Sequence, residues 1–216
     1  MEITLKKKSI FLMSALMLVS VAFFSDAPVR RAIVRWQGPS WNESSTKKIV
    51  AAVSCYGDWP ELMLLGGFGF FVARRVRSQR WQKIFLCAML ASTVAGGLVN
   101  TLRLTTGRTR PRVAEQHWYG LYHAGKWTIG NAEYNSFPSG HTATAIGFAA
   151  VILFASPYWG AIAMLLAMSV AGSRLLLGAH HPSDLTVASL LALGIAWALW
   201  NQVSYRAPRW IERWIT

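Results

Sequence analysis

Charge is scarce in this sequence of 216 residues, because Asp, Glu, Lys and Arg together make up only 14% of it, against roughly a quarter in soluble domains. Cysteine is nearly absent, and its two copies exclude a small fold held by disulfides. A hydrophobic share of 53% and 11 tryptophans exclude a disordered chain. The composition therefore argues against an ordinary soluble domain.

Acidic residues are the rarer charged residues: nine stand against 22 lysines and arginines, which gives a net charge of +13. Such an excess suggests a nucleic-acid partner when the basic residues cover a polar surface. Here they gather at the edges of long apolar runs, where basic residues anchor membrane spans. We therefore expect membrane lipids as partners, and no nucleic acid.

Long stretches without any Asp, Glu, Lys or Arg predict the membrane spans. These stretches cover residues 9–25, 62–73, 84–102, 142–173 and 185–205. A helix needs about 20 apolar residues to cross the hydrocarbon core, and the fourth stretch is long enough for two crossings that turn at Ser156 and Pro157. We predict an all-α, single-domain protein over residues 1–216, with six transmembrane helices at about residues 9–25, 60–77, 84–104, 141–156, 158–177 and 184–202.

Three basic clusters decide the expected orientation. They lie before the first span, between the second and third spans, and after the last span, at residues 6–8, 74–83 and 206–213. An even number of spans places all three clusters on one side, which the positive-inside rule makes cytoplasmic. The clusters hold 11 of the 22 basic residues, so several of the others need a separate reason. We expect an integral inner-membrane protein with its active site at the outer, periplasmic face.

The region around the first span leaves two interpretations open. Its lysine-rich start, apolar stretch and small residues at 25–27 also resemble a cleavable signal peptide, whose loss would leave five spans. Residues 28–58 are mixed in character and contain tryptophan. There we expect an interfacial segment in which one of residues 44–46 caps a short helix.

All five histidines fall between residues 117 and 181, at the outer face of the predicted bundle or in its loops. Three short segments with further polar residues border the same face. They read Arg103-(six residues)-Arg110-Pro111, Pro138-Ser139-Gly140-His141, and Ser173-Arg174-(five residues)-His180-(three residues)-Asp184. We expect these segments to form one site.

The arginines of these segments predict an anion site. Arg103, Arg110 and Arg174 lie at the rim of a low-dielectric bundle, where a cation needs an anionic partner, yet Asp184 is the one carboxylate between residues 134 and 211. The guanidinium fork matches phosphate oxygens. Pro138 and Ser139 open a helix whose N-terminal N–H groups, with the serine hydroxyl, suit the same anion, and Gly140 allows close approach.

Two histidines and a carboxylate then supply chemistry. His180 and Asp184 are four residues apart, so the carboxylate can bond one ring nitrogen and leave the other free to attack phosphorus. His180 is therefore the predicted nucleophile. His141, on the other side of the site, would protonate the leaving oxygen and later activate water.

The three segments resemble the signature motifs of the type 2 phosphatidic acid phosphatase superfamily: Lys-x6-Arg-Pro, Pro-Ser-Gly-His and Ser-Arg-x5-His-x3-Asp. Every gap matches, and the six-helix membrane branch of that family covers essentially the whole chain. Arg103 stands where the family usually has lysine, which keeps the charge but changes the donor geometry. The resemblance implies phosphate ligands at Arg103, Arg110, Ser139, Gly140 and Arg174, an acid at His141, a nucleophile at His180 and an orienting carboxylate at Asp184.

The expected activity is hydrolysis of a terminal lipid phosphate through a phosphohistidine. Candidate substrates in the family are undecaprenyl diphosphate, the 1-phosphate of lipid A, phosphatidylglycerol phosphate and phosphatidate. A phosphotransferase that passes the phosphate to a second lipid is the nearer alternative, and a lipid-phosphate binder or transporter without enzymatic activity is the farther one. The sequence does not fix the oligomeric state.

We expect neither metal nor cofactor, because hard-cation phosphatases gather several carboxylates and only Asp184 lies near the motifs. His181 is expected to be a bystander beside His180. Arg108, inside the first motif, could contact substrate or simply anchor at the interface.

Overall fold

The computed structural model describes residues 2–205, and side chains from residue 9 to residue 204. The basic cluster expected at residues 206–213 lies outside the described residues, and so do the side chains of the cluster at residues 6–8. The described chain is mostly helical. Its α-helices are α1 (Glu2–Gln37), α2 (Ser45–Cys55), α3 (Trp59–Arg75), α4 (Gln79–Thr106), α5 (Gly140–Ala155), α6 (Pro157–Leu176) and α7 (Pro182–Tyr205).

Each predicted span overlaps one of these helices, whereas α2 is the short extra helix expected between the first two spans. Ser44 caps α2, since its hydroxyl accepts a hydrogen bond from the N–H of Lys47 at 3.1 Å. Pro157 opens α6 one residue after the Ser156 cap, as predicted. Within residues 2–205, α1, α4, α6 and α7 are long and apolar enough to cross a membrane. The apolar α5 has 16 residues and α3 has 17.

Two expectations need correction. Residues 28–37 were expected in a segment separate from the first span, but they continue α1 through Pro28. This end of α1 is anchored by Arg30, whose guanidinium donates to the carbonyls of Pro111 (2.7 Å) and Val113 (3.3 Å). The fold is also not strictly all-α, because the loop between α4 and α5 contains an antiparallel hairpin of β1 (Tyr122–His123) and β2 (Lys126–Trp127).

The hairpin turn follows from its two central residues. Ala124 and Gly125 have φ angles of 48° and 79°, and two consecutive positive φ values are typical of the tight turn that joins two antiparallel strands. Two short 3₁₀ helices, Pro39–Glu43 and Ala132–Tyr134, complete the described elements.

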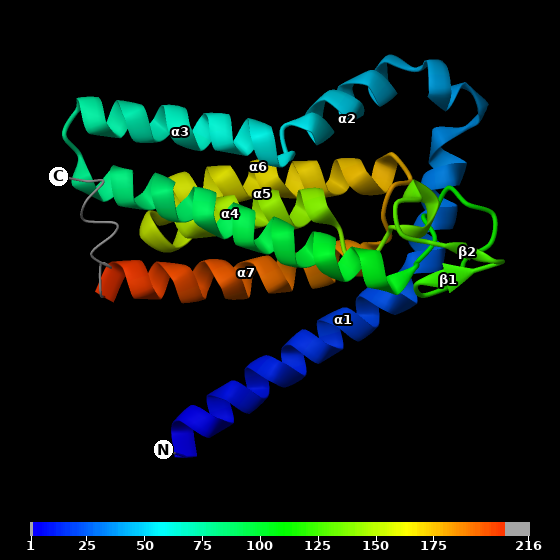
Figure 1. The fold of residues 1–216 in the computed structure, drawn as a ribbon, viewed down its shortest axis with the longest axis horizontal. Helices are drawn as coiled ribbons and strands as arrows, with labels where there is room; N and C mark the ends of the chain where they lie inside the picture. Colours follow the sequence, from blue (N-terminus) through cyan, green and yellow to red (C-terminus); the bar gives the residue numbers. More distant parts are fainter. Residues whose placement is uncertain (1, 206–216) are drawn as a thin grey trace.

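Helix α5 forms the centre of the bundle and packs against α4, α6 and α7. Small residues allow these helices to approach closely, which is how membrane helices associate. A Cβ at Gly160 would lie 2.0 Å from the Cα of Leu153, and one at Gly147 would lie 3.1 Å from the carbonyl oxygen of Ala91. By contrast, the first half of α1 stands away from the bundle (Figure 1) and exposes large apolar side chains such as Phe11 and Met17.

The predicted site residues gather at one end of the bundle. Here α4 ends, α5 begins and the connection from α6 to α7 is made, at the end of the bundle where the later part of α1 and the hairpin also lie (Figure 1). The connection between α3 and α4, which carries the basic cluster at residues 74–83, lies at the opposite end. The separation of these two ends agrees with the separation expected from the sequence.

Candidate active site

His180 occupies a fully enclosed position between α6 and α7. Its side chain is 0% exposed, and its Nδ1 lies 2.7 Å from the carbonyl oxygen of Ser136 and 3.5 Å from Oδ2 of Asp184. Both oxygens accept hydrogen bonds, so Nδ1 carries the proton and Nε2 of the neutral ring is free to attack. Burial lowers the pKa of His180, against the opposing effect of Asp184, and this keeps Nε2 unprotonated. Nε2 is buried and has no hydrogen-bond partner among the described residues.

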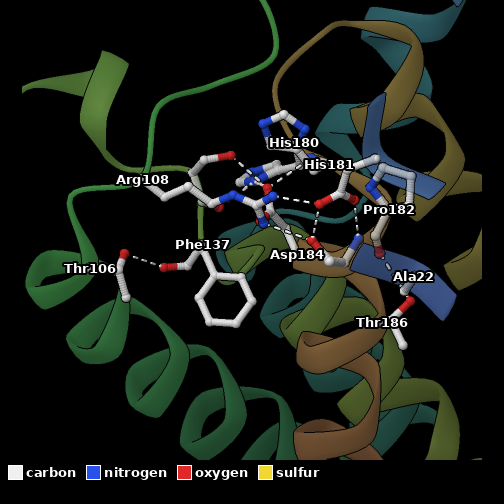
Figure 2. Close-up of polar contacts among 12 residues, drawn as sticks. Ala22, Thr106, Arg108, Phe137, His180, His181, Pro182, Asp184 and Thr186 are labelled. Atoms are coloured by element: carbon white, nitrogen blue, oxygen red, sulfur yellow. Dashed lines mark hydrogen bonds and ion pairs between the residues drawn. The ribbon is translucent and has the colours of Figure 1, made fainter. Parts of the chain in front are cut away.

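Asp184 is held from several sides in the first turn of α7, which begins at Pro182. Its carboxylate accepts hydrogen bonds from the hydroxyl of Ser136 (2.5 Å) and the backbone N–H of His181 (2.7 Å). It also forms an ion pair with Arg108 (Figure 2). The sequence predicted Asp184 as the partner of one ring nitrogen of His180, and the structure places the Ser136 carbonyl nearer to Nδ1 than the carboxylate. The carboxylate and the carbonyl therefore fix the tautomer together.

The three predicted arginines face one another near His180. The Nε atoms of Arg103, Arg110 and Arg174 are all buried without a hydrogen-bond partner in the described part of the chain. Arg174 uses Nη1 to donate to the hydroxyl of Ser54 at 2.6 Å. Burial, together with the charges of neighbouring arginines, lowers the pKa of Arg110 to about 10, so it remains a cation at neutral pH. Half-buried cations crowded in this way favour a bound anion.

The start of α5 brings the second motif to the same place. Ser139 is the N-cap: its hydroxyl accepts from the N–H of Thr142 at 3.4 Å and lies 2.9 Å from the hydroxyl of that residue. A Cβ at Gly140 would lie 2.8 Å from Oδ1 of Asn100, so the glycine leaves room for this amide, and 3.7 Å from Nη1 of Arg103, an ordinary contact. Ser139 therefore begins the helix as expected, and close approach of an anion to Gly140 stays a prediction.

His141 follows in the first turn of α5 and has a partner that the sequence did not indicate. Its Nε2 lies 2.7 Å from Oδ1 of Asp58, the residue that precedes α3, and these side chains are 22% and 44% exposed. Burial and the charge of Glu61 raise the pKa of Asp58, which Arg174 opposes. Arg174, His180, Arg103 and Arg110 all act electrostatically on His141, which places it in the same site.

A cavity of about 610 Å³ opens beside these groups, within the usual range of ligand pockets. His180, Arg110 and Arg174 are among its lining residues, and Val29 and Ile33 of α1 contribute apolar side chains to the lining. The cavity can therefore admit a molecule with an anionic group at one end and an apolar side. No group of three or more His, Cys, Asp or Glu side chains arranged for a metal ion occurs within residues 2–205.

Sequence reasoning missed several residues of this site. Arg108 is buried and paired with carboxylates rather than anchored at an interface. His181 is buried too: its backbone N–H binds Asp184, and its Nε2 lies 3.3 Å from the carbonyl of Thr109. Asp26 and Asp58 come from segments far away in the sequence, and no local spacing could reveal them. A buried arginine does, however, require a carboxylate, and that requirement was a usable signal for Arg108.

Comparison with known proteins agrees with this geometry. The model of the PAP2 superfamily matches residues 82–208, which is more than half of the chain. The chain belongs to the PAP2 superfamily. Among curated relatives, the lipid A 1-phosphatase of Rhizobium etli is 29% identical over 191 residues, which cover 83% of this chain and 77% of the relative. Phosphatidylglycerophosphatase B of Escherichia coli K12 is 42% identical over 81 residues, 34% of this chain and 30% of that protein.

Two solved structures share the fold. The structure of LpxE from Aquifex aeolicus superposes with a TM-score of 0.57 at 22% identity and covers 82% of this chain and 94% of its own. A transmembrane PAP2-type phosphatidylglycerolphosphate phosphatase from Bacillus subtilis gives a TM-score of 0.59 at 22% identity, covering 93% and 96% of the two chains. The predicted superfamily and the prediction of a phosphatase that acts on lipid phosphates are thereby confirmed.

Proposed function

We propose that this PAP2 protein hydrolyses the terminal phosphate of a membrane lipid through a covalent phosphohistidine at His180. The observation that carries the proposal is the set of unpartnered buried nitrogens: Nε2 of His180 together with Nε of Arg103, Arg110 and Arg174. Buried polar atoms are rarely left without partners. A tetrahedral phosphate supplies oxygens for the arginines and an electrophilic phosphorus for the histidine.

The proposed reaction has two steps. Nε2 of His180 attacks phosphorus while the bond to the lipid oxygen breaks, and His141 donates the proton that this oxygen needs. His141, now neutral, then takes a proton from water, whose oxygen attacks phosphorus and releases His180 and inorganic phosphate. The arginines stabilise the charge on the equatorial oxygens in both transition states.

Among the candidate substrates, a lipid A 1-phosphate is favoured by extent of similarity, because the Rhizobium etli relative with that name aligns over 83% of this chain. The cavity of about 610 Å³ leaves room for a headgroup larger than phosphate alone. Phosphatidylglycerol phosphate has support from shorter matches to proteins of that activity. Undecaprenyl diphosphate and phosphatidate remain candidates on the motifs.

We also propose the orientation in the membrane. Six helices, α1 and α3 to α7, would cross the inner membrane, and the site would face the periplasm. Support comes from the basic connection between α3 and α4, at residues 74–83, which lies at the end of the bundle opposite His180. A lipid headgroup could then reach the cavity sideways along the apolar side chains of α1 while its tail stays in the bilayer.

The test is phosphate release by the detergent-purified protein from a panel of the four candidate lipids, with and without a chelator. We expect release from at least one lipid, no loss in chelator, and loss of about 10⁴-fold or more in His180→Ala. The exposed His117→Ala is the matched control and should retain wild-type rates. Absence of release from every lipid, or full activity in His180→Ala, would overturn the proposal.

A further inference from the structure

Asp26 is a buried carboxylate in α1. The part of this helix before Asp26 exposes mostly apolar side chains. The residue is 9% exposed. Its Oδ1 accepts from the backbone N–H of Ser183 at 2.9 Å, and its Oδ2 accepts from the hydroxyl of Ser183 at 2.7 Å. Nη2 of Arg108 lies 2.5 Å from the same Oδ2. One side chain of α1 thus binds the loop after α4 and the first turn of α7.

Arg108 bridges Asp26 and the predicted catalytic carboxylate. Its Nη1 binds Asp184 (Figure 2). The same Nη1 donates to the hydroxyl of Ser183 at 2.7 Å, while Nη2 binds Asp26. Arg108 therefore divides one positive charge between two buried carboxylates. Asp184 in turn lies 3.5 Å from Nδ1 of His180. The contacts run without a break from α1 to the nucleophile.

The guanidinium of Arg108 is also fixed by aromatic rings. It lies 4.6 Å from the ring centroid of Trp118, 5.4 Å from that of Phe23 and 5.7 Å from that of Phe137. These cation–π contacts surround the charge with low-dielectric material. A buried guanidinium cannot move into water or lose its proton. If one carboxylate partner were removed, Arg108 would therefore pair entirely with the other carboxylate.

We propose that Asp26 is a positioning residue of the phosphatase site, which acts on His180 through Arg108 and Asp184; this inference rests on the proposed function. Asp26 accepts one of the three side-chain hydrogen bonds that Arg108 donates, and it fixes Ser183 next to Asp184. The carboxylate of Asp184 thereby keeps its place near His180 and its negative charge for the ring that becomes cationic during the reaction. Without Asp26, Arg108 pairs entirely with Asp184, and this carboxylate is less available to orient His180 and stabilise its positive charge.

The same contacts make α1 a part of the catalytic unit. A cleavage at the small residues 25–27, the signal-peptide alternative of the sequence, would separate Asp26 from Arg108 and Ser183. The inference therefore requires that α1 stays covalently attached in the active enzyme.

The test measures steady-state phosphate release by the full-length protein in detergent, with the best lipid of the panel, for Asp26→Asn, Arg108→Gln and the double variant. Asp26→Asn should lower kcat by about 10- to 100-fold, the range seen when an outer partner of a catalytic group is removed. KM should stay within about twofold, because the cradle of three arginines is untouched. In the Arg108→Gln background, Asp26→Asn should change kcat by less than about threefold.

Glu43→Gln is the control, a carboxylate-to-amide change at an exposed residue outside this network, and should match wild type. A thermal melt of each variant reports folding. If Asp26→Asn does not fold, Asp26→Glu replaces it: the charge is kept, the carboxylate is displaced by a methylene, and kcat should still fall severalfold with KM unchanged.

Three results would overturn the inference while wild type remains active: an unchanged kcat in Asp26→Asn, an unchanged kcat in a folded Asp26→Glu when Asp26→Asn is unfolded, or equal effects of Asp26→Asn with and without Arg108. A wild-type protein that releases no phosphate would instead overturn the proposed function on which the inference rests.

Discussion

The two histidines of the site have opposite surroundings. The side chain of His180 is 0% exposed and is bound by a backbone carbonyl and a carboxylate that is itself 0% exposed. His141 is 22% exposed, and its partner Asp58 is 44% exposed at the start of α3. A nucleophile benefits from a fixed orientation and exclusion of water, whereas a group that exchanges protons with a leaving oxygen and with water must be reachable. The difference assigns His180 to attack and His141 to proton transfer.

The largest effect in this comparison is expected from a change beside the buried His180. Asp184→Asn should lower kcat by about 10³-fold, because an amide can neither fix the tautomer of His180 in the same way nor stabilise its positive charge. Steady-state rates measured beside a melting curve would separate this effect from unfolding. A loss of less than tenfold in a folded variant would show that the Ser136 carbonyl alone supports His180.

The same change of carboxylate to amide should cost less activity beside the more exposed His141. Asp58→Asn should lower kcat by about tenfold, because the amide can still bond Nε2 of His141 although it no longer supports the charged ring. The comparison of Asp58→Asn with Asp184→Asn under identical conditions is the measurement. A greater loss in Asp58→Asn than in Asp184→Asn would reverse the two roles.

The pH profile gives the smallest expected effect. Burial lowers the pKa of His180 from its ordinary value of about 6.5, and only the form with a free Nε2 attacks. The acid limb of kcat/KM should therefore lie below pH 6.5 if it reports His180. In Asp184→Asn it should move further toward acid, because the opposing carboxylate is gone. An acid limb whose midpoint lies above pH 6.5, or whose midpoint does not shift in Asp184→Asn, contradicts this account.

The same comparison explains what the sequence could reveal. The motifs gave His180, Asp184, His141 and the arginines because their spacing within each segment is local and their segments border one face. The apolar stretches likewise predicted the positions of the long helices. Pro157 and Ser44 were readable because a proline and a cap act on the helix that they begin.

Contacts between distant segments could not be read in this way. Asp58 meets His141, and Asp26 meets Arg108, only after α1 and α3 have packed against the start of α5 and α7. The carbonyl of Ser136 has no signature at all, because every residue carries one. The continuation of α1 through Pro28 was missed for a similar reason, since the anchoring contacts of Arg30 are with the loop at residues 111–113.

The most direct test of the account is to trap the phosphoenzyme. Protein mixed with lipid labelled in its terminal phosphate is quenched in alkali, in which phosphohistidine survives, and the label is located by peptide mapping. The account predicts label on His180 in the wild-type protein, loss of that label after a chase with unlabelled lipid, and no label in His180→Ala. Label on another residue, or turnover by the wild-type protein without any labelled protein, would contradict it.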